Sequence, residues 1–466
     1  MTFFLSHPSY LAPMKFATLL LLAPFAALAQ TKPAAPLLPP ADPGIQKLAD
    51  EISAKNLEAN IRRLVAFGTR HTLSDTQSPT RGIGAARSYV RDEFLKYSRA
   101  GGGRLTVEMD TFTVQPDGRR ISRPVLMANV LATLPGTDPT DTRVLLVSGH
   151  IDSRVSDVMN ATADAPGAND DGSGTVLVME LARVLAGQKF PCTLKFVAVQ
   201  GEEQGLYGSG HLAARAKKEG WNLVAMLNND IVCNSHGFDP EISDATQVRV
   251  FSEGVPASET PEQARQRRQL SSENDAPSRQ LARYAQRIGQ LYGKGHQVVL
   301  EYRPDRFLRG GDHTPFNQQG FAAVRFTEMN EDYTHQHQDL RTEKGRAYGD
   351  VTEGVDFAYL RRNAGLNLAT MASLALAPAA PAQVEVLTAT LTNRTELRWQ
   401  APATGPRPAG YVVLVRATSA PQWQQRIPVA GLTADLPISK DNFIFGVASV
   451  DGAGHESVPV LPVVGR

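Results

Sequence analysis

Three apolar runs in the middle of the chain alternate with segments of helical periodicity. The runs cover residues 143–149, 193–200 and 223–230, and the helical segments between them cover residues 175–186 and 209–219. Each run is continuously apolar, which is typical of parallel strands that are buried on both faces. Strands that alternate with helices of this length predict an α/β fold, with a mixed, mostly parallel sheet sandwiched by helices.

The alternation continues on both sides of this centre. Two extended runs precede it, and a helical segment over residues 278–292 is followed by a strand-like run over residues 322–328. Residues 235–276 are polar and rich in Arg, Ser and Glu around one plausible strand, residues 246–254, which indicates an insertion over the sheet. We expect one α/β domain over residues 45–375.

The first residues carry a targeting pattern. Lys15 is followed by an apolar run over residues 16–29 that ends in the small-residue motif "ALA". A basic residue, an apolar stretch of this length and such a motif are typical of a secretory signal peptide, here residues 1–29. Residues 30–44 are rich in Pro and Ala and predict an open linker. We expect a secreted or periplasmic protein, and an uncleaved N-terminal anchor is the alternative.

The last part of the chain changes in character. Short β-like runs are separated there by turn-rich spacers, which predicts a small all-β sandwich over residues 380–466. Its pattern resembles a fibronectin type III module, and Trp399 and Tyr411 would supply its core. The runs cover residues 384–392, 395–400, 410–417 and 443–450.

Charge and cysteine content restrict the partners. The chain has 48 basic and 47 acidic side chains, a balance that gives no reason to expect nucleic acid or an anionic membrane as a partner. The two cysteines, Cys192 and Cys233, permit one disulfide in an exported protein. Both flank predicted strands rather than loops that meet, so the sequence favours unpaired thiols and leaves the pairing open.

Acidic and histidine side chains follow the predicted strands. In an open α/β sheet, ligands bind beyond the carboxyl ends of the strands, so side chains from distant segments are expected to meet at one rim. The residues at the strand ends are His150, Asp152, Glu202, Glu203, Asp230, His335 and His337, and Asp170 and Asp171 precede a helix.

Such a concentration of carboxylates requires positive charge. Uncompensated carboxylates raise one another's pKa values and cost several kcal/mol of stability. A divalent cation removes the conflict, and a mixture of imidazole nitrogens with carboxylate oxygens favours Zn²⁺. Because more ligands are present than one tetrahedral ion uses, the sequence predicts two zinc ions about 4 Å apart with a bridging water.

The motifs at the strand ends resemble those of a known family. "SGHIDS" (148–153), "GANDDGSG" (167–174), "GEEQGLYGSGH" (201–211) and "MLNND" (226–230) resemble the successive motifs of the co-catalytic di-zinc aminopeptidases of metallopeptidase family twenty-eight. The resemblance covers residues 45–375 and implies the zinc-exopeptidase fold. The family also contains glutamate carboxypeptidases, glutaminyl cyclases and a receptor ectodomain.

The resemblance assigns a role to each motif residue. Glu202, beside a ligand, would be the general base that takes a proton from the bridging water, and Asp152 would orient the imidazole of His150. The implied metal ligands are His150 and Asp230 on one zinc, Glu203 and His335 on the other, and Asp170 between the two.

The last ligand motif departs from the family pattern. The family carries Tyr-His-Thr-Pro-x-Asp, whereas this chain has "DYTHQHQD" at residues 332–339. Alignment on Asp339 selects His335 as the ligand and leaves His337 as the alternative. Tyr333 is displaced by one position, which puts a role in polarising the substrate in doubt. "GGDHTPFN" at residues 310–317 mimics the ligand motif but has Asn in place of the acid, and we interpret it as structural.

The sequence therefore predicts a secreted metallo-aminopeptidase that hydrolyses N-terminal residues from peptide or protein substrates. One alternative is a glutaminyl cyclase-like enzyme with a single zinc, although that branch has a longer insertion after the Glu pair than the two residues Gln204 and Gly205 found here. The other is a non-catalytic binding ectodomain. All five ligand positions are filled in this chain, which argues against that alternative. The preferred N-terminal residue, the oligomeric state and the choice between amino- and carboxypeptidase specificity stay open.

Overall fold

The structure is a computed structural model that describes residues 38–465. The predicted signal peptide lies outside these residues. Helix α1 (Pro43–Asp50) begins inside the predicted linker. It forms there because the Asp42 carboxylate accepts the Gly44 N–H at 2.6 Å, and because Pro43 occupies the first turn, where its missing N–H is not needed. No helix between residues 38 and 465 combines the length and apolar character of a membrane span.

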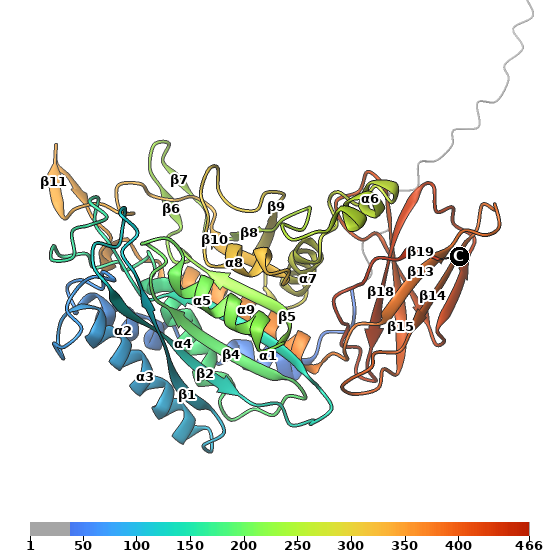
Figure 1. The fold of residues 1–466 in the computed structure, drawn as a ribbon, viewed down its shortest axis with the longest axis horizontal. Helices are drawn as coiled ribbons and strands as arrows, with labels where there is room; N and C mark the ends of the chain where they lie inside the picture. Colours follow the sequence, from blue (N-terminus) through green and yellow to red (C-terminus); the bar gives the residue numbers. More distant parts are fainter. Residues whose placement is uncertain (1–37, 466) are drawn as a thin grey trace, which may run out of the picture. The chain divides into compact units, whose positions relative to one another are not determined.

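An eight-stranded sheet forms the centre of the described chain (Figure 1). β4, β3, β5 and β10 run parallel to one another, whereas β1 with β2, β2 with β4 and β10 with β8 are antiparallel. The predicted mixed, mostly parallel sheet is confirmed. In order across the sheet, the strands are β1 (Thr106–Val114), β2 (Val125–Leu134), β4 (Thr193–Val199), β3 (Arg143–His150), β5 (Asn222–Asn229), β10 (Ala323–Glu328), β8 (Gln247–Phe251) and β9 (Gln297–Glu301).

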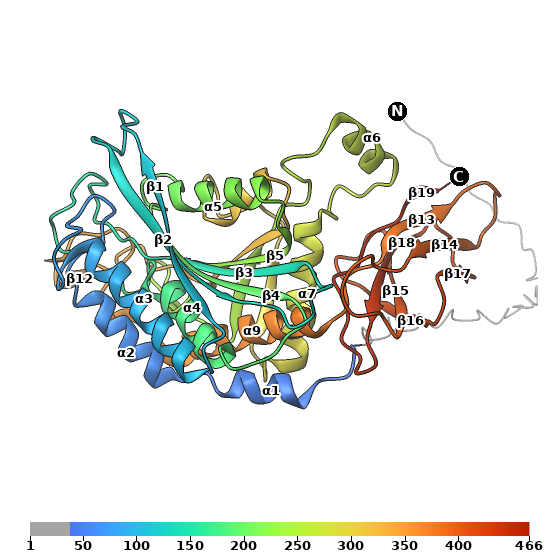
Figure 2. The same cartoon turned by 60° about the horizontal axis from the view of Figure 1, so that its bottom comes forward.

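Helices cover both faces of this sheet, and Figure 2 shows α5 on one side and α1, α3, α4 and α9 on the other. The apolar run in β3 is continuous because its side chains are buried on both faces of the sheet. Leu145 and Val147 join one core, and Val144 and Leu146 join the other. Burying an aliphatic side chain of this size contributes about 1.5–3 kcal/mol. The helices are α2 (Ala54–Val65), α3 (Gly82–Ala100), α4 (Gly172–Leu185), α7 (Pro277–Tyr292) and α9 (Phe357–Leu376) beside α1, and α5 (Tyr207–Lys218) and α8 (His313–Gln318) opposite.

The predicted insertion contributes more to the sheet than its polarity indicates. β8, which we expected to lie over the sheet, is instead paired between β10 and β9 inside it. Val248 and Val250 are buried, whereas Gln247 and Arg249, which alternate with them, are partly exposed. This short alternation is a weak signal beside continuous apolar runs. The remainder is a hairpin, β6 (His236–Gly237) with β7 (Ile242–Ser243), and the surface helix α6 (Pro261–Gln269).

Both cysteines are buried and unpaired within the described residues. Cys192 lies next to the carbonyl oxygen of Ala375, and the Cys233 thiol contacts the Asn169 side chain at 3.1 Å. Burial raises the pKa of Cys192 to about 12, so this thiol is a packing residue rather than a nucleophile.

A small β domain follows α9, as expected. Its sheets are β17-β14-β13-β19 and β16-β15-β18. The rings of Trp399 and Tyr411 meet edge to face between the sheets, with centroids 5.5 Å apart. The strands are β13 (Ala382–Leu387), β14 (Thr395–Gln400), β15 (Gly410–Ala417), β16 (Gln425–Val429), β17 (Thr433–Leu436), β18 (Phe443–Val450) and β19 (Val463–Gly465).

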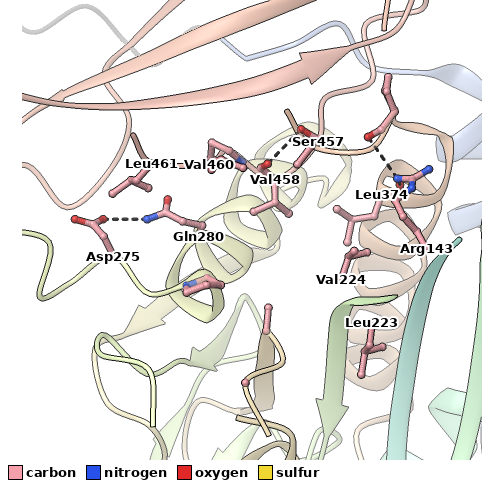
Figure 3. A pocket seen from close by; sticks show the side chains of 16 residues that line it. Arg143, Leu223, Val224, Asp275, Gln280, Leu374, Ser457, Val458, Val460 and Leu461 are labelled. Carbon is pink, nitrogen blue, oxygen red and sulfur yellow. Dashed lines mark hydrogen bonds between the residues drawn. The ribbon is translucent and has the colours of Figure 1, made fainter. Parts of the chain in front are cut away.

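Buried ion pairs join the β domain to α7. The Asp275 carboxylate lies 2.6 Å from Arg283 of α7 and 2.6 Å from Arg416 of β15. Glu456 lies in the same way between Arg287 of α7 and Arg426 of β16. A cavity of about 460 Å³ opens beside these contacts, at the amino ends of β3 and β5, and its walls are mainly aliphatic (Figure 3).

We expect Asp275→Asn to lower the free energy of unfolding by about 3 kcal/mol, because it leaves two buried guanidinium groups without a counter-charge. Unfolding in urea, followed by Trp fluorescence, measures the change. Asp435→Asn removes an exposed carboxylate paired with Arg394 in the same domain and should cost less than about 0.5 kcal/mol. Equal urea midpoints for the two variants would contradict a stabilising role of the buried Asp275 ion pairs.

Candidate metal centre

The carboxyl ends of the parallel strands meet at one edge of the sheet. β3 ends at His150, the loop after β4 carries Glu202 and Glu203, and Asp230 directly follows β5. Within each of three groups, donor atoms of the members lie within 4.8 Å of one another. The groups are His150, Asp170 and Asp230; His150, Glu202 and Glu203; and Asp170, Glu203 and His337.

His337, and not His335, completes this cluster. His337 Nε2 lies 2.9 Å from Glu203 Oε1 and 2.9 Å from Asp170 Oδ2. His335 belongs to none of the three groups; its ring is 3.8 Å from Asp332 and packs against Gly354. The expectation that His335 joins the cluster is therefore corrected, and His337, the alternative that the sequence left open, takes its place.

The local backbone explains this correction. Amides of His335 and Gln336 both donate to the Asp332 carbonyl oxygen, which forms a helical turn, and His337 then adopts a left-handed φ of 57°. The two histidines therefore project in different directions. Asp339, on which the sequence alignment rests, instead accepts a hydrogen bond from Ser156 at 2.6 Å.

The imidazole of His150 is fixed on one side and open on the other. Its Nδ1 lies 3.0 Å from the Asp152 carbonyl oxygen. Its Nε2 is 3.1 Å from Asp170 Oδ1 and 3.8 Å from Asp230 Oδ1, yet it makes no hydrogen bond of acceptable geometry within residues 38–465. A buried nitrogen left without a partner among carboxylates is the arrangement expected of a metal ligand.

Asp152 contacts the His150 imidazole, but through its backbone carbonyl rather than through its carboxylate. Its Oδ1 accepts the Gly201 amide at 2.9 Å and its Oδ2 accepts the Glu203 amide at 3.2 Å, whereas Oδ1 is 3.7 Å from His150 Nδ1. The Asp152 carboxylate therefore holds the loop that carries Glu202 and Glu203, and its backbone carbonyl orients the imidazole.

Three further residues, which sequence reasoning did not assign to the site, hold the cluster in place. Asp171 caps α4 through the Gly174 amide (2.8 Å) and accepts the His150 amide (2.8 Å). Asp350 accepts the Asp170 amide at 2.7 Å. A Cβ on Gly174 would collide with the Asn229 carbonyl oxygen, so glycine permits α4 to start directly against β5. The motif "GANDDGSG" offered a signal for Asp171 and Gly174, and none was available for Asp350.

The electrostatics reflect crowded acids. Burial raises the pKa of Glu202 well above its ordinary value, and Glu203 adds to this effect. Burial also acts on Glu203, but His337 and Arg154 lower its pKa below the ordinary value. Burial opposes a charge on His337, yet Glu203 and Asp170 raise its pKa to about 10. Glu202 is thus the acid of the cluster that is least stabilised as an anion by the protein itself.

Arginines supply part of the compensating charge. Arg154 lies 2.9 Å from Glu203, and the buried Arg325 lies 2.9 Å from Asp230. Asp312 is also buried close by, its oxygens have no hydrogen-bond partner within the described chain, and burial raises its pKa to about 7. A hollow of about 400 Å³ opens over the cluster and contains Glu202, Glu203 and His337 in its wall.

Known proteins resemble this chain in sequence and in fold. Residues 129–352 match the profile of Peptidase family M28. A probable zinc metalloprotease of Leptosphaeria maculans is 47% identical over 422 residues, which cover 90% of this chain and 97% of that protein. The LapA aminopeptidase of Legionella pneumophila shares the fold at 18% identity and a TM-score of 0.51, over 75% of this chain and 78% of its own.

A glutaminyl cyclase of Macrostomum lignano also shares the fold, at 18% identity and a TM-score of 0.50, over 73% of this chain and 95% of its own. The fold alone therefore does not separate the two reactions. The family follows from the profile match together with the sequence identity to the Leptosphaeria protein. That identity extends through both the α/β and the β domains. The chain belongs to peptidase family M28.

Proposed function

We propose that the protein is a zinc-dependent aminopeptidase with two zinc ions per chain. The observation that carries the proposal is that Asp170 belongs both to the group with His150 and Asp230 and to the group with Glu203 and His337. Each zinc would thus have a histidine and a carboxylate of its own, and Asp170 would serve both. The relatives named as zinc metalloproteases support the choice of metal and of reaction class.

The side chains present fit this metal. The donors are imidazole nitrogens and carboxylate oxygens, which suit Zn²⁺ better than the all-oxygen sites of Ca²⁺ or Mg²⁺. The unpartnered Nε2 of His150 points toward Asp170 and Asp230, so a cation placed among them would satisfy a buried group. The bound zinc ions would polarise the scissile carbonyl and acidify the attacking water.

The protein's own residues would move the proton. Glu202 lies in the pocket wall beside Glu203 and His150, and it is not needed as a ligand in either of the two groups that share Asp170. Its carboxylate would accept a proton from the attacking water and deliver it to the nitrogen of the departing amine. Asp152 would keep Glu202 at this position through the backbone of residues 201–203.

A panel of dipeptide amides tests the proposal. We expect release of the N-terminal amino acid, loss of activity after exhaustive chelation, and recovery on addition of zinc. Release of the C-terminal residue from N-blocked peptides would instead indicate a carboxypeptidase. Cyclisation of N-terminal Gln with one tightly bound zinc per chain would indicate a glutaminyl cyclase, and no turnover despite bound zinc would contradict an enzymatic role.

We further propose that the chain is exported and that residues 380–466 form a fibronectin type III-like domain. The proposal that the chain is exported rests on the sequence pattern of residues 1–29 alone. N-terminal sequencing of the mature protein, with cleavage expected before Gln30, would test it.

A further inference from the structure

Four arginines line the hollow over the metal centre, and they differ in how their charge is balanced. Arg154 pairs with Glu203, as described above, and Arg306 lies 2.9 Å from Glu331. Arg120 and Arg309 form no ion pair within residues 38–465, although both face the same hollow and both are exposed. Two cationic groups in the pocket wall are therefore available to a ligand.

The guanidinium of Arg120 is directed at the metal-binding loop. It donates one hydrogen bond, to the carbonyl oxygen of Glu203 at 2.7 Å. A guanidinium has five N–H donors, so the others remain for a ligand. The loop that carries Arg120 is held in place, because Asp117 accepts the amides of Arg119, Arg120 and Ile121 at 2.8 Å each. The backbone position of Arg120 is thus set before any ligand binds.

Arg309 lies on a different segment, the loop between β9 and α8. It donates to the Gln336 side-chain oxygen at 3.3 Å, and the Gln336 amide donates in turn to Asp170 at 2.9 Å. Arg325 anchors the same loop through the Gly310 carbonyl oxygen at 3.0 Å. Arg309 therefore lies one neutral side chain away from the carboxylate that would serve both zinc ions.

The charge of the hollow depends on its metals. The acids in its wall are as numerous as the arginines, so the protein alone is close to neutral there. With two divalent cations bound the wall would become strongly positive, and Arg120 and Arg309 are the arginines in it that form no ion pair within residues 38–465. The four acids are Asp170, Glu202, Glu203 and Asp230.

We propose that this pocket selects peptides that carry a carboxylate next to the scissile bond, and that Arg120 and Arg309 bind it. The inference rests on the proposed function of the same site. Arginine matches a carboxylate with two parallel N–H donors, and a peptide can present that group in two ways. It can come from an acidic N-terminal side chain or from the free α-carboxylate of a dipeptide.

Two matched pairs of substrates distinguish these sources. Glu-Gly-amide against Gln-Gly-amide differs only in a side-chain carboxylate, and Leu-Gly against Leu-Gly-amide differs only in the α-carboxylate. We expect the zinc-loaded enzyme to show a kcat/KM about tenfold or more higher for the charged member of at least one pair. The preference should weaken with added salt, because exposed charges are screened. Equal kcat/KM within both pairs would overturn the proposal.

The arginine variants assign the preference to residues. Arg120→Gln and Arg309→Gln are each expected to lower the ratio of kcat/KM for the charged substrate to kcat/KM for its neutral partner about fivefold or more, mainly through KM of the charged substrate. Arg303→Gln is the matched control: it removes an exposed arginine of the same loop that stacks on Phe307 outside the hollow. A preference that survives in both variants, or falls equally in the control, would overturn the assignment.

Binding measurements separate this inference from the proposed reaction. Calorimetric titration of Leu-Gly and Leu-Gly-amide, and of Glu-Gly-amide and Gln-Gly-amide, into the zinc-loaded protein carrying Glu202→Gln needs no turnover. Tighter binding of a charged peptide by this variant, together with no hydrolysis of any of the four peptides by the zinc-loaded wild-type protein, would support the inference and reject the aminopeptidase. Zinc-dependent hydrolysis without discrimination within either pair would support the aminopeptidase and reject the inference.

Discussion

Replacing Glu202 by Gln is expected to lower kcat by roughly 10³-fold while the chain keeps its zinc. Gln has nearly the same size and shape as Glu but cannot accept the proton of the attacking water. The effect should appear in kcat and kcat/KM alike, because the lost interaction exists only during reaction.

Glu219→Gln provides the control for this substitution. Glu219 follows α5, the helix that begins just after the Glu202 loop, and its side chain is 46% exposed. Its replacement should leave kcat unchanged within about twofold. Glu202→Gln with more than a tenth of the normal turnover would remove Glu202 from the reaction, and loss of zinc in this variant would make Glu202 a ligand instead.

His337→Ala is expected to weaken the binding of one zinc ion by about 100-fold or more and to lower kcat by roughly 10³-fold. Nε2 of His337 is the nitrogen that meets Glu203 and Asp170. His335→Ala, two residues earlier, should change neither quantity by more than about twofold, since His335 belongs to none of the three groups of donor atoms. Zinc titration with a competing chelator and steady-state kinetics measure both.

The opposite outcome is informative. An active His337→Ala variant beside an inactive His335→Ala variant would mean that the segment after β10 rearranges when metal binds. That result would restore the family alignment on Asp339.

The sheet and its functional edge could be predicted from the sequence because they depend on local patterns. Continuous apolar runs identify strands buried on both faces, and in β3 the side chains divide between two cores. Parallel strands place their carboxyl ends at one edge, so His150, Glu203 and Asp230 had to lie near one another.

The choice between His335 and His337 could not be made in this way. It depends on a helical turn at Asp332 and on a left-handed φ at His337, and neither has a sequence signal such as glycine at that position. Alignment on Asp339 uses residue spacing alone, which does not show that the chain turns at Asp332 and again at His337.

The sources of positive charge were also underestimated. Crowded carboxylates indicated metal, but Arg154 and Arg325 neutralise two of them from segments whose partners the sequence does not reveal. Arg325 lies in β10, within a run that reads as apolar, and its pairing with Asp230 becomes visible only once β5 and β10 are neighbours. Contacts of this kind are set by tertiary packing rather than by local pattern.

The number of zinc ions in the folded protein tests the central claim most directly. Elemental analysis of the purified chain, equilibrated with zinc and freed of excess, should give two ions per chain, and the His337→Ala variant should retain one. A wild-type protein that holds no zinc, or only one ion that is unaffected by His337→Ala, would contradict a two-metal centre joined by Asp170.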